Sequence, residues 1–185
     1  MSKIKKFSKW IHQKNTLALK LISIILFVSF MTIVLPGVSE TTKEITGTNA
    51  SPDTSFLYTS QDLNDIAESY GELGRSYYIR SRFSFDIIWP IVYLFFLVTT
   101  LSTLFKGIQN LIPLAGWLFD FLENLGASFV MYRYPRDSGF IAIVTPIFTL
   151  LKWVFIYISF GLIIVGLIII ARNKLLMSPD KKRQG

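Results

Sequence analysis

The sequence predicts an all-α integral membrane protein: a four-transmembrane-helix bundle with an extracytoplasmic amphipathic helix in the first outer loop. Of its 185 residues 51% are hydrophobic and 15% aromatic, and the apolar residues come in runs long enough to cross a bilayer. Lysine and arginine cluster directly beside these runs, whereas the long segment between the first two runs is rich in acidic residues. This distribution is typical of a multi-pass membrane protein.

Four apolar segments are predicted to cross the membrane, because a helix needs about 20 apolar residues to do so. The first covers residues 17–35 and is expected to end at Pro36-Gly37, the second covers 85–105, and the third covers 111–132. The last apolar run, residues 140–171, is too long for one straight span. Pro146 and Lys152 are expected to divide it into a kinked or interfacial lead-in, 140–147, and a fourth span, 150–171.

The bias of basic residues predicts the orientation of these spans. The leader, residues 1–16, is basic and has no acidic residue, and the tail, residues 172–185, is also basic. Lys106 lies in the short connector after the second span. All three segments fall on one side of a four-span protein, so both termini are predicted to be cytoplasmic in a cell membrane, at the ends of a membrane domain covering 17–171.

One alternative changes the number of spans. A basic leader, an apolar run and the sequence PGVSE also resemble a secretory signal with Ser39 at the cleavage site. The apolar run is longer than such signals usually have. Cleavage would leave three spans and place the mature N-terminus outside, and the sequence leaves this alternative open.

The outer loop, residues 37–84, is predicted to contain a flexible connector followed by a helix over about 60–80. Residues 40–55 are rich in Thr, Gly, Ser and Asn, which favours the connector. From Thr59 a capping residue is followed by apolar residues at helical spacing. Arg75 lies on the same helix face as Gly71, so this arginine either meets lipid headgroups or turns inwards to acidic groups of the bundle.

The third span carries two carboxylates and an amide. Asp120, Glu123 and Asn124 are spaced i, i+3, i+4 and therefore share one helix face. Because a charge at the centre of a bilayer costs about 2.5–3.5 kcal/mol on insertion scales, these groups are expected to be protonated, paired or hydrated in a cavity. Lys152 is the expected partner of Glu123, and Asp120 is expected to be neutral or hydrated.

The second span is expected to contribute to the same polar cluster. Asp86 and Tyr93 lie roughly on one side of it, and Pro90 leaves the Asp86 carbonyl free of its helical hydrogen bond. The predicted ligand-binding cluster comprises Asp86, Tyr93, Asp120, Glu123, Asn124 and Lys152, with Arg75 and Arg80 above them. The alternative is a set of ion pairs that only fixes helix packing.

Composition also limits the chemistry. The chain has no cysteine, and its one histidine, His12, lies in the leader, so thiolate, disulfide and multi-histidine metal sites are not expected. We expect no cofactor and no metal. The net charge of +7 is placed beside apolar runs, which favours a membrane surface over nucleic acid as its partner.

The predicted topology is similar to that of claudin-like proteins and vitamin K epoxide reductases, which also have four spans and a long first outer loop. Claudins have a cysteine pair in that loop and the reductases a Cys-x-x-Cys motif. This chain has neither. The resemblance is therefore one of topology, and it implies no activity.

Three functions remain as hypotheses. The first is an outward-facing pocket that handles a small polar ligand, a lipid headgroup or a proton-coupled substrate. The second is a non-catalytic structural or accessory subunit that binds another membrane protein. The third is an enzyme at the outer leaflet, which the absence of histidine and cysteine from the bundle makes the least favoured.

Overall fold

The computed structural model describes residues 2–176, and these residues form helices and no strands. The predicted tail residues Lys181, Lys182 and Arg183 lie outside the described residues. Within the described residues, three helices are long and apolar enough to cross a membrane: Leu17–Thr46, Phe85–Leu104 and Phe140–Leu176. The all-helical class and a membrane-compatible composition are thus confirmed for the part of the chain that is described.

The first membrane-compatible helix is longer than predicted. It consists of α2 (Leu17–Ser29), a π-helical turn η1 (Phe30–Val34) and α3 (Leu35–Thr46). Pro36 does not end it, because proline lies in the first turn of α3 directly after the wider π turn, where its ring meets no regular i−4 carbonyl. Residues 40–46, expected in a flexible connector, are therefore helical.

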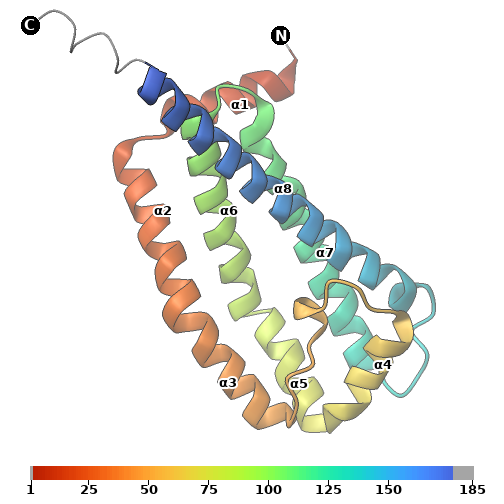
Figure 1. The fold of residues 1–185 in the computed structure, drawn as a ribbon. Helices are drawn as coiled ribbons and strands as arrows, with labels where there is room; N and C mark the ends of the chain where they lie inside the picture. Colours follow the sequence, from red (N-terminus) through yellow and green to blue (C-terminus); the bar gives the residue numbers. More distant parts are fainter. Residues whose placement is uncertain (1, 177–185) are drawn as a thin grey trace, which may run out of the picture.

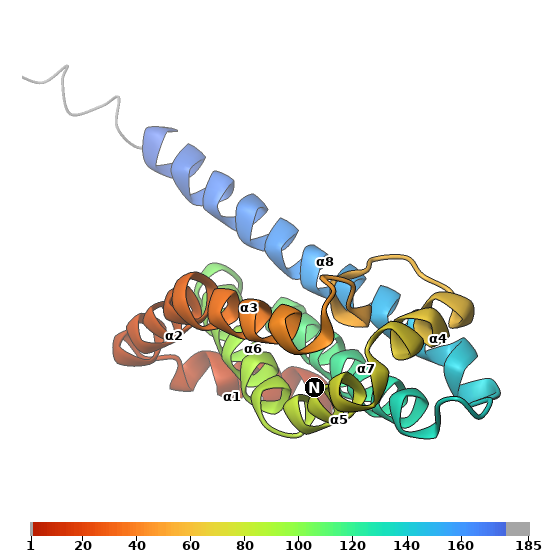
Figure 2. The same ribbon diagram turned by 90° about the horizontal axis from the view of Figure 1, so that it is seen from below.

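The last helix is also continuous. α8 runs from Phe140 to Leu176 through Pro146, so the predicted lead-in, 140–147, and the predicted span, 150–171, belong to one helix. Its neighbour α7 (Ile112–Arg133) packs along it, and α6 (Phe85–Leu104) packs against α2, α7 and α8 (Figure 1). α8 extends beyond the other helices at its C-terminal end (Figure 2).

The predicted outer helix over about 60–80 is two helices, α4 (Ser60–Ser69) and α5 (Gly71–Arg82). Thr59 caps α4: its side chain accepts from the Asp62 amide, and the Asp62 carboxylate accepts from the Thr59 amide at 2.7 Å. Gly71 separates the two helices with φ of 59°, a left-handed conformation that favours glycine. The second helix therefore runs in a new direction.

The 12 residues of α1 (Lys3–Lys14) lie across the opposite end of the bundle from α4 and α5 (Figure 1). Buried polar contacts hold α1 in place: the Ser8 hydroxyl donates to Asn110 Oδ1 at 2.8 Å, and Asn110 donates to the Ser102 hydroxyl at 3.0 Å. Asn110 belongs to η3 (Ile108–Leu111), a short 3-10 helix between α6 and α7.

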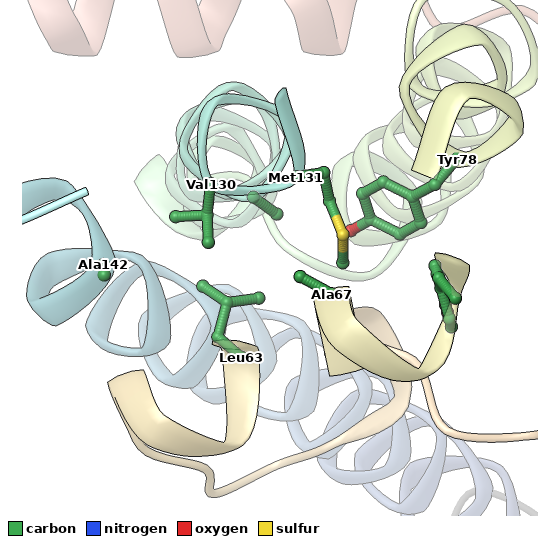
Figure 3. Packing of buried hydrophobic residues seen from close by; sticks show 8 residues of the cluster. Leu63, Ala67, Tyr78, Val130, Met131 and Ala142 are labelled. Atoms are coloured by element: carbon green, nitrogen blue, oxygen red, sulfur yellow. The ribbon is translucent and has the colours of Figure 1, made fainter. Parts of the chain in front are cut away.

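Two apolar clusters form the core. One joins α4 and α5 to α7 and α8, and the close-up shows Leu63, Ala67, Tyr78, Val130, Met131 and Ala142 of this cluster (Figure 3). The other lies along α6 and α8, where Leu97 and Leu101 are fully buried. Between these clusters the helices carry the charged residues.

Candidate functional site: a charged cavity

The cluster starts from the buried ion pair between Lys152 of α8 and Glu123 of α7. Lys152 is 4% exposed and Glu123 is fully buried. Small residues let these two helices approach closely: a Cβ built on Gly126 would collide with Thr145 of α8, and one on Gly116 would meet Ile156 at 3.4 Å. Close packing of α7 on α8 therefore brings the ammonium to the carboxylate.

Asp120 and Asn124 connect α7 to α6. The Tyr93 hydroxyl donates to Asp120 Oδ2 at 2.8 Å, and Asn124 Nδ2 donates to Asp120 Oδ1 at 3.2 Å. The same amide nitrogen lies 3.5 Å from the Asp86 carbonyl oxygen. Pro90 cannot donate to that carbonyl within the helix, so an Asn124 side chain occupies part of the acceptor capacity that the proline leaves free.

Arg82, the last residue of α5, is the arginine of the cluster. It forms ion pairs with Asp53 and, at 3.3 Å, with Asp86, and it donates to Asn124 Oδ1 at 3.2 Å. Its guanidinium carbon also lies 4.1 Å from the centre of the Tyr78 ring. One side chain thus links a loop, α5, α6 and α7.

The two arginines expected to cover the cluster lie elsewhere. Arg75 donates to the Ala67 carbonyl at 2.9 Å and lies over the Tyr134 ring, 4.8 Å from its centre. Arg80 is exposed to solvent. Of the two alternatives for Arg75 the inward one is therefore wrong, as is the expected place of Arg80 above the carboxylates, because the break at Gly71 sets the direction of α5 and brings Arg82 inwards. The remaining predicted site residues, Asp86, Tyr93, Asp120, Glu123, Asn124 and Lys152, do come together.

Asp53 is a site residue that sequence reasoning missed. It lies in η2 (Pro52–Thr54), a 3-10 turn of the outer loop that contacts α8. Trp153 Nε1 donates to the Asp53 carbonyl at 3.2 Å, and the Ser51 hydroxyl donates to its carboxylate at 3.0 Å. Such a contact between residues 100 positions apart has no local signal in the sequence. For Arg82 the sequence did contain a local signal, which is its i, i+4 spacing from Asp86.

Outside the membrane-compatible helices, electrostatics matches this geometry. Burial raises the pKa of the Asp53 carboxyl, but Arg82 and Lys152 outweigh this effect and hold that pKa below its usual value. Burial lowers the pKa of Arg82, but Asp53 and the nearby Tyr78 and Asp86 outweigh it and keep the guanidinium charged. Asp53 and Arg82 are thus a charged pair in a buried setting.

A cavity of about 420 Å³ borders the cluster. We call it the charged cavity. Its polar lining includes Asp53, Arg82, Asp86, Asp120 and Lys152, and its apolar lining includes Phe27, Met31, Val38, Trp89, Ile156 and Phe160. It is bounded by α2, η1 and α3 on one side and by α6 and α8 on the other. A molecule in it would meet fixed charges and hydrocarbon together.

Several buried polar atoms at the cavity have no hydrogen-bond partner among the described residues. They are Arg82 Nε, the Tyr78 hydroxyl and Asp53 Oδ1. Since an unpaired buried polar group costs about 1–3 kcal/mol, each of these enclosed atoms lowers the stability of the cluster. Within residues 2–176, no group of three histidine or carboxylate side chains is arranged to hold a metal ion.

Comparisons of this chain with protein-family models, with curated proteins and with solved structures find no match.

Proposed function

We propose that this protein is a four-span membrane protein that binds an amphiphilic ligand in the charged cavity. The polar headgroup lies against Arg82, Lys152 and the carboxylates, and the hydrocarbon chain lies along the apolar wall. The observation that carries the proposal is the mixed lining of one cavity of about 420 Å³. Of the ligands considered from sequence, a lipid headgroup with its chain fits that lining better than a small polar solute does.

The order of residues along α8 supports the two-part ligand. Lys152, Ile156 and Phe160 all line the cavity and follow each other at intervals of four, so they share one helix face. At a rise of 1.5 Å per residue, the lining changes from charged to aromatic over about 12 Å. On the facing wall, α2 and η1 supply Phe27 and Met31.

The proposal includes α7 as a fourth crossing, with both termini cytoplasmic. α7 is not among the three helices whose composition alone qualifies. Its 22 residues extend about 33 Å, which matches the hydrocarbon thickness. Asp120, Glu123 and Asn124 are buried, while Leu118 and Phe121 are 47% and 46% exposed. Polar groups inside and apolar groups outside are what a lipid-exposed helix requires.

A binding experiment tests this function. A saturated single-chain lysophospholipid is added to the protein in mild detergent, and the unfolding temperature is measured. We expect the lipid to raise that temperature in the wild type, because a ligand that binds only the folded state stabilises it. Val38→Trp places a large ring in the cavity wall and should abolish the shift.

Ile33→Trp is the matched control, because Ile33 is on the same wall helix but 72% exposed and outside the cavity lining. An equal shift in Val38→Trp and wild type would contradict the cavity as the site. An absent shift in the wild type, together with a protein partner that co-purifies in mild detergent and raises the unfolding temperature, would favour the structural or accessory subunit instead.

A further inference from the structure

One wall of the charged cavity, formed by η1 and α3, is attached to the bundle mainly at one end. Of residues 30–46, all of which the structure describes, Thr46 alone is buried. The hydroxyls of Thr41, Thr42 and Thr46 donate to carbonyl oxygens one turn earlier in the same helix, not to neighbouring helices. Beyond the adjoining η1, α3 packs chiefly on α5, where Thr46 meets Gly74.

The preceding helix, α2, is fixed to the bundle by contrast. The hydroxyls of Ser23 and Thr99 share a hydrogen bond of 2.8 Å, and the Phe27 ring stacks on Phe96 of α6 with 4.2 Å between ring centres. The Phe27 ring also lies 6.2 Å from the Phe160 ring of α8, and both rings line the cavity. Any movement of this wall is therefore expected in α3, beyond Phe27.

The backbone between α2 and α3 has three features at which helices bend. In the π turn η1 the Leu35 amide donates to the Phe30 carbonyl, five residues earlier. Pro36 has no amide hydrogen to donate, and Gly37 has a low helix propensity. Sharp bends in helices occur at such turns and residues. At its other end α3 finishes at Gly47, with φ of 70°, so it is a helical segment between two joints.

The cavity lining on this wall changes from apolar to polar along the chain. Its residues are first Phe27, Met31, Leu35 and Val38, and then Ser39, Thr42 and Lys43. At 1.5 Å per residue this lining extends over roughly 24 Å. Because Phe27 lies beside Phe160, the polar end is on the same side as Lys152 of α8. In the proposed orientation this is the outer side, so a bound lipid has its headgroup and chain at the depths they occupy in the outer leaflet.

We propose that α3 is a lateral gate, hinged at η1, through which a lipid of the outer leaflet enters the charged cavity from the side. This inference rests on the proposed function, because it names the source of the same ligand and the element that controls its entry. Entry from the side needs no reorientation of the lipid, since headgroup and chain keep their depths. Entry through water would first expose the whole apolar chain.

A reversible cross-link tests the gate. A Cβ built on Gly74 lies 3.4 Å from Thr46 Cγ2 and 3.5 Å from Thr46 Cα, so Thr46→Cys combined with Gly74→Cys can form a disulfide that ties α3 to α5. The chain has no other cysteine that could compete. The protein in mild detergent is loaded with a tritiated saturated lysophosphatidylcholine, and its release is timed after an excess of the unlabelled lipid is added.

We expect oxidation of the double variant to slow this release about tenfold or more, because opening of a closing element limits exchange. The amount of lipid bound at equilibrium should stay the same, and reduction should restore the faster release. Thr46→Cys alone, treated with the same oxidant, is the control and should release the lipid as the wild type does.

Thiol labelling provides a second test that does not need the disulfide. Thr46 is 6% exposed and becomes accessible only when α3 leaves α5. An excess of a maleimide should therefore modify Thr46→Cys at least as fast as the lipid is released. Ile45→Cys, at a position that is 42% exposed, should react at once. If Thr46→Cys stays unmodified while the lipid exchanges, α3 is not the gate.

The outcomes separate the two proposals. Equal release from the oxidised and reduced double variant, with binding that Val38→Trp abolishes, overturns the gate and leaves the proposed function standing. Absence of lysophosphatidylcholine binding in the wild type overturns both. If the double variant does not fold or does not form its disulfide, the labelling of Thr46→Cys decides.

Discussion

Arg82 is the residue on which most contacts of the cluster converge, since it joins Asp53, Asp86 and Asn124. Arg82→Ala would leave both carboxylates buried without their cation. We expect a loss of about 3–5 kcal/mol in stability, the usual cost of breaking a buried pair by removing one partner. The midpoint of unfolding in a detergent-compatible denaturant measures it.

Arg80→Ala is the matched control, because Arg80 is on the same helix but exposed. It should change stability by no more than about 0.5 kcal/mol. Equal effects of the two substitutions would show that Arg82 does not organise the cluster.

Asp53 predicts a specific response to acid. Its pKa in the folded protein lies below the ordinary value of 3.8, because Arg82 and Lys152 outweigh the effect of burial. The Asp53–Arg82 ion pair therefore contributes its full stabilisation at pH values above the pKa of Asp53 in the unfolded chain. This stabilisation is lost as the pH falls through the lower pKa of Asp53 in the folded protein. Asp53→Asn should lower stability at pH 7 by about 1–3 kcal/mol.

The unfolding temperatures of wild type and Asp53→Asn, followed from neutral pH down to acid, provide the measurement. The two curves should converge at the acid end. Parallel curves would contradict an ionised Asp53 in the folded protein.

At the residue scale, the sequence predicted the cluster where local rules apply. The i, i+3, i+4 spacing of Asp120, Glu123 and Asn124 requires one helix face, and the cost of a buried charge required a cation such as Lys152. Asp53 had no local signal, and the i, i+4 spacing of Arg82 from Asp86 does not by itself show that this arginine faces the cluster. Their positions depend on the turn at Gly71 and on the docking of η2 on α8, which are tertiary effects.

At the scale of elements, the contact between α7 and α8 positions the Lys152–Glu123 pair. A Cβ at Gly126 would collide with Thr145 of α8. We expect Gly126→Ala to cost about 1–3 kcal/mol, the usual effect of overpacking, and to weaken lysophospholipid binding because it moves α8 away from the cluster. Unfolding and binding measurements on the same sample test both effects.

Gly161→Ala is the control on α8. A Cβ there meets nothing within 4 Å, so alanine should be neutral or slightly stabilising through its helix propensity. If the two alanine variants behaved alike, close approach at Gly126 would not matter.

Element boundaries were predicted less well than the existence of the helices. The apolar runs indicated helices near residues 17–35, 85–105, 111–132 and 150–171, and each of these ranges is largely helical. Pro36 was expected to end the first span, yet it lies within a helical run, whereas a kink at Pro146 remains compatible with the continuous helix α8. Proline marks a lost hydrogen bond, and whether a helix ends there depends on the packing around it.

At the scale of the whole molecule, the four-span arrangement can be tested by single cysteines, because the chain has none of its own. Lys106→Cys and Asp137→Cys flank α7 and should react with an impermeant maleimide from opposite sides of the membrane. We expect Asp137→Cys to be labelled from outside and Lys106→Cys only after the cytoplasmic side is opened.

Lys14→Cys should be labelled from the same side as Lys106→Cys. Asn49→Cys should be labelled from the same side as Asp137→Cys. Labelling of residues 106 and 137 from the same side would show that α7 does not cross.

The composition of the whole chain predicted a helical membrane protein well, since this class follows from hydropathy. The sequence also predicted α7 as a span, and its crossing stays a prediction, because its carboxylates lower the hydropathy that reveals the other three helices among residues 2–176.

The π-helical turn at Phe30–Val34 has a consequence for the alignment of the two halves of the first long helix. A π turn holds one residue more than the α-helical repeat, and each residue turns a helix by about 100°. Deleting one residue there would rotate α3 against α2 by roughly that angle. Phe27 would still stack on Phe96, at 4.2 Å between ring centres, but Thr46 would swing away from Gly74, the residue on α5 that it now contacts. The extra residue thus rotates α3 relative to α2, so that the two halves of one long helix pack against their neighbours with differently oriented faces.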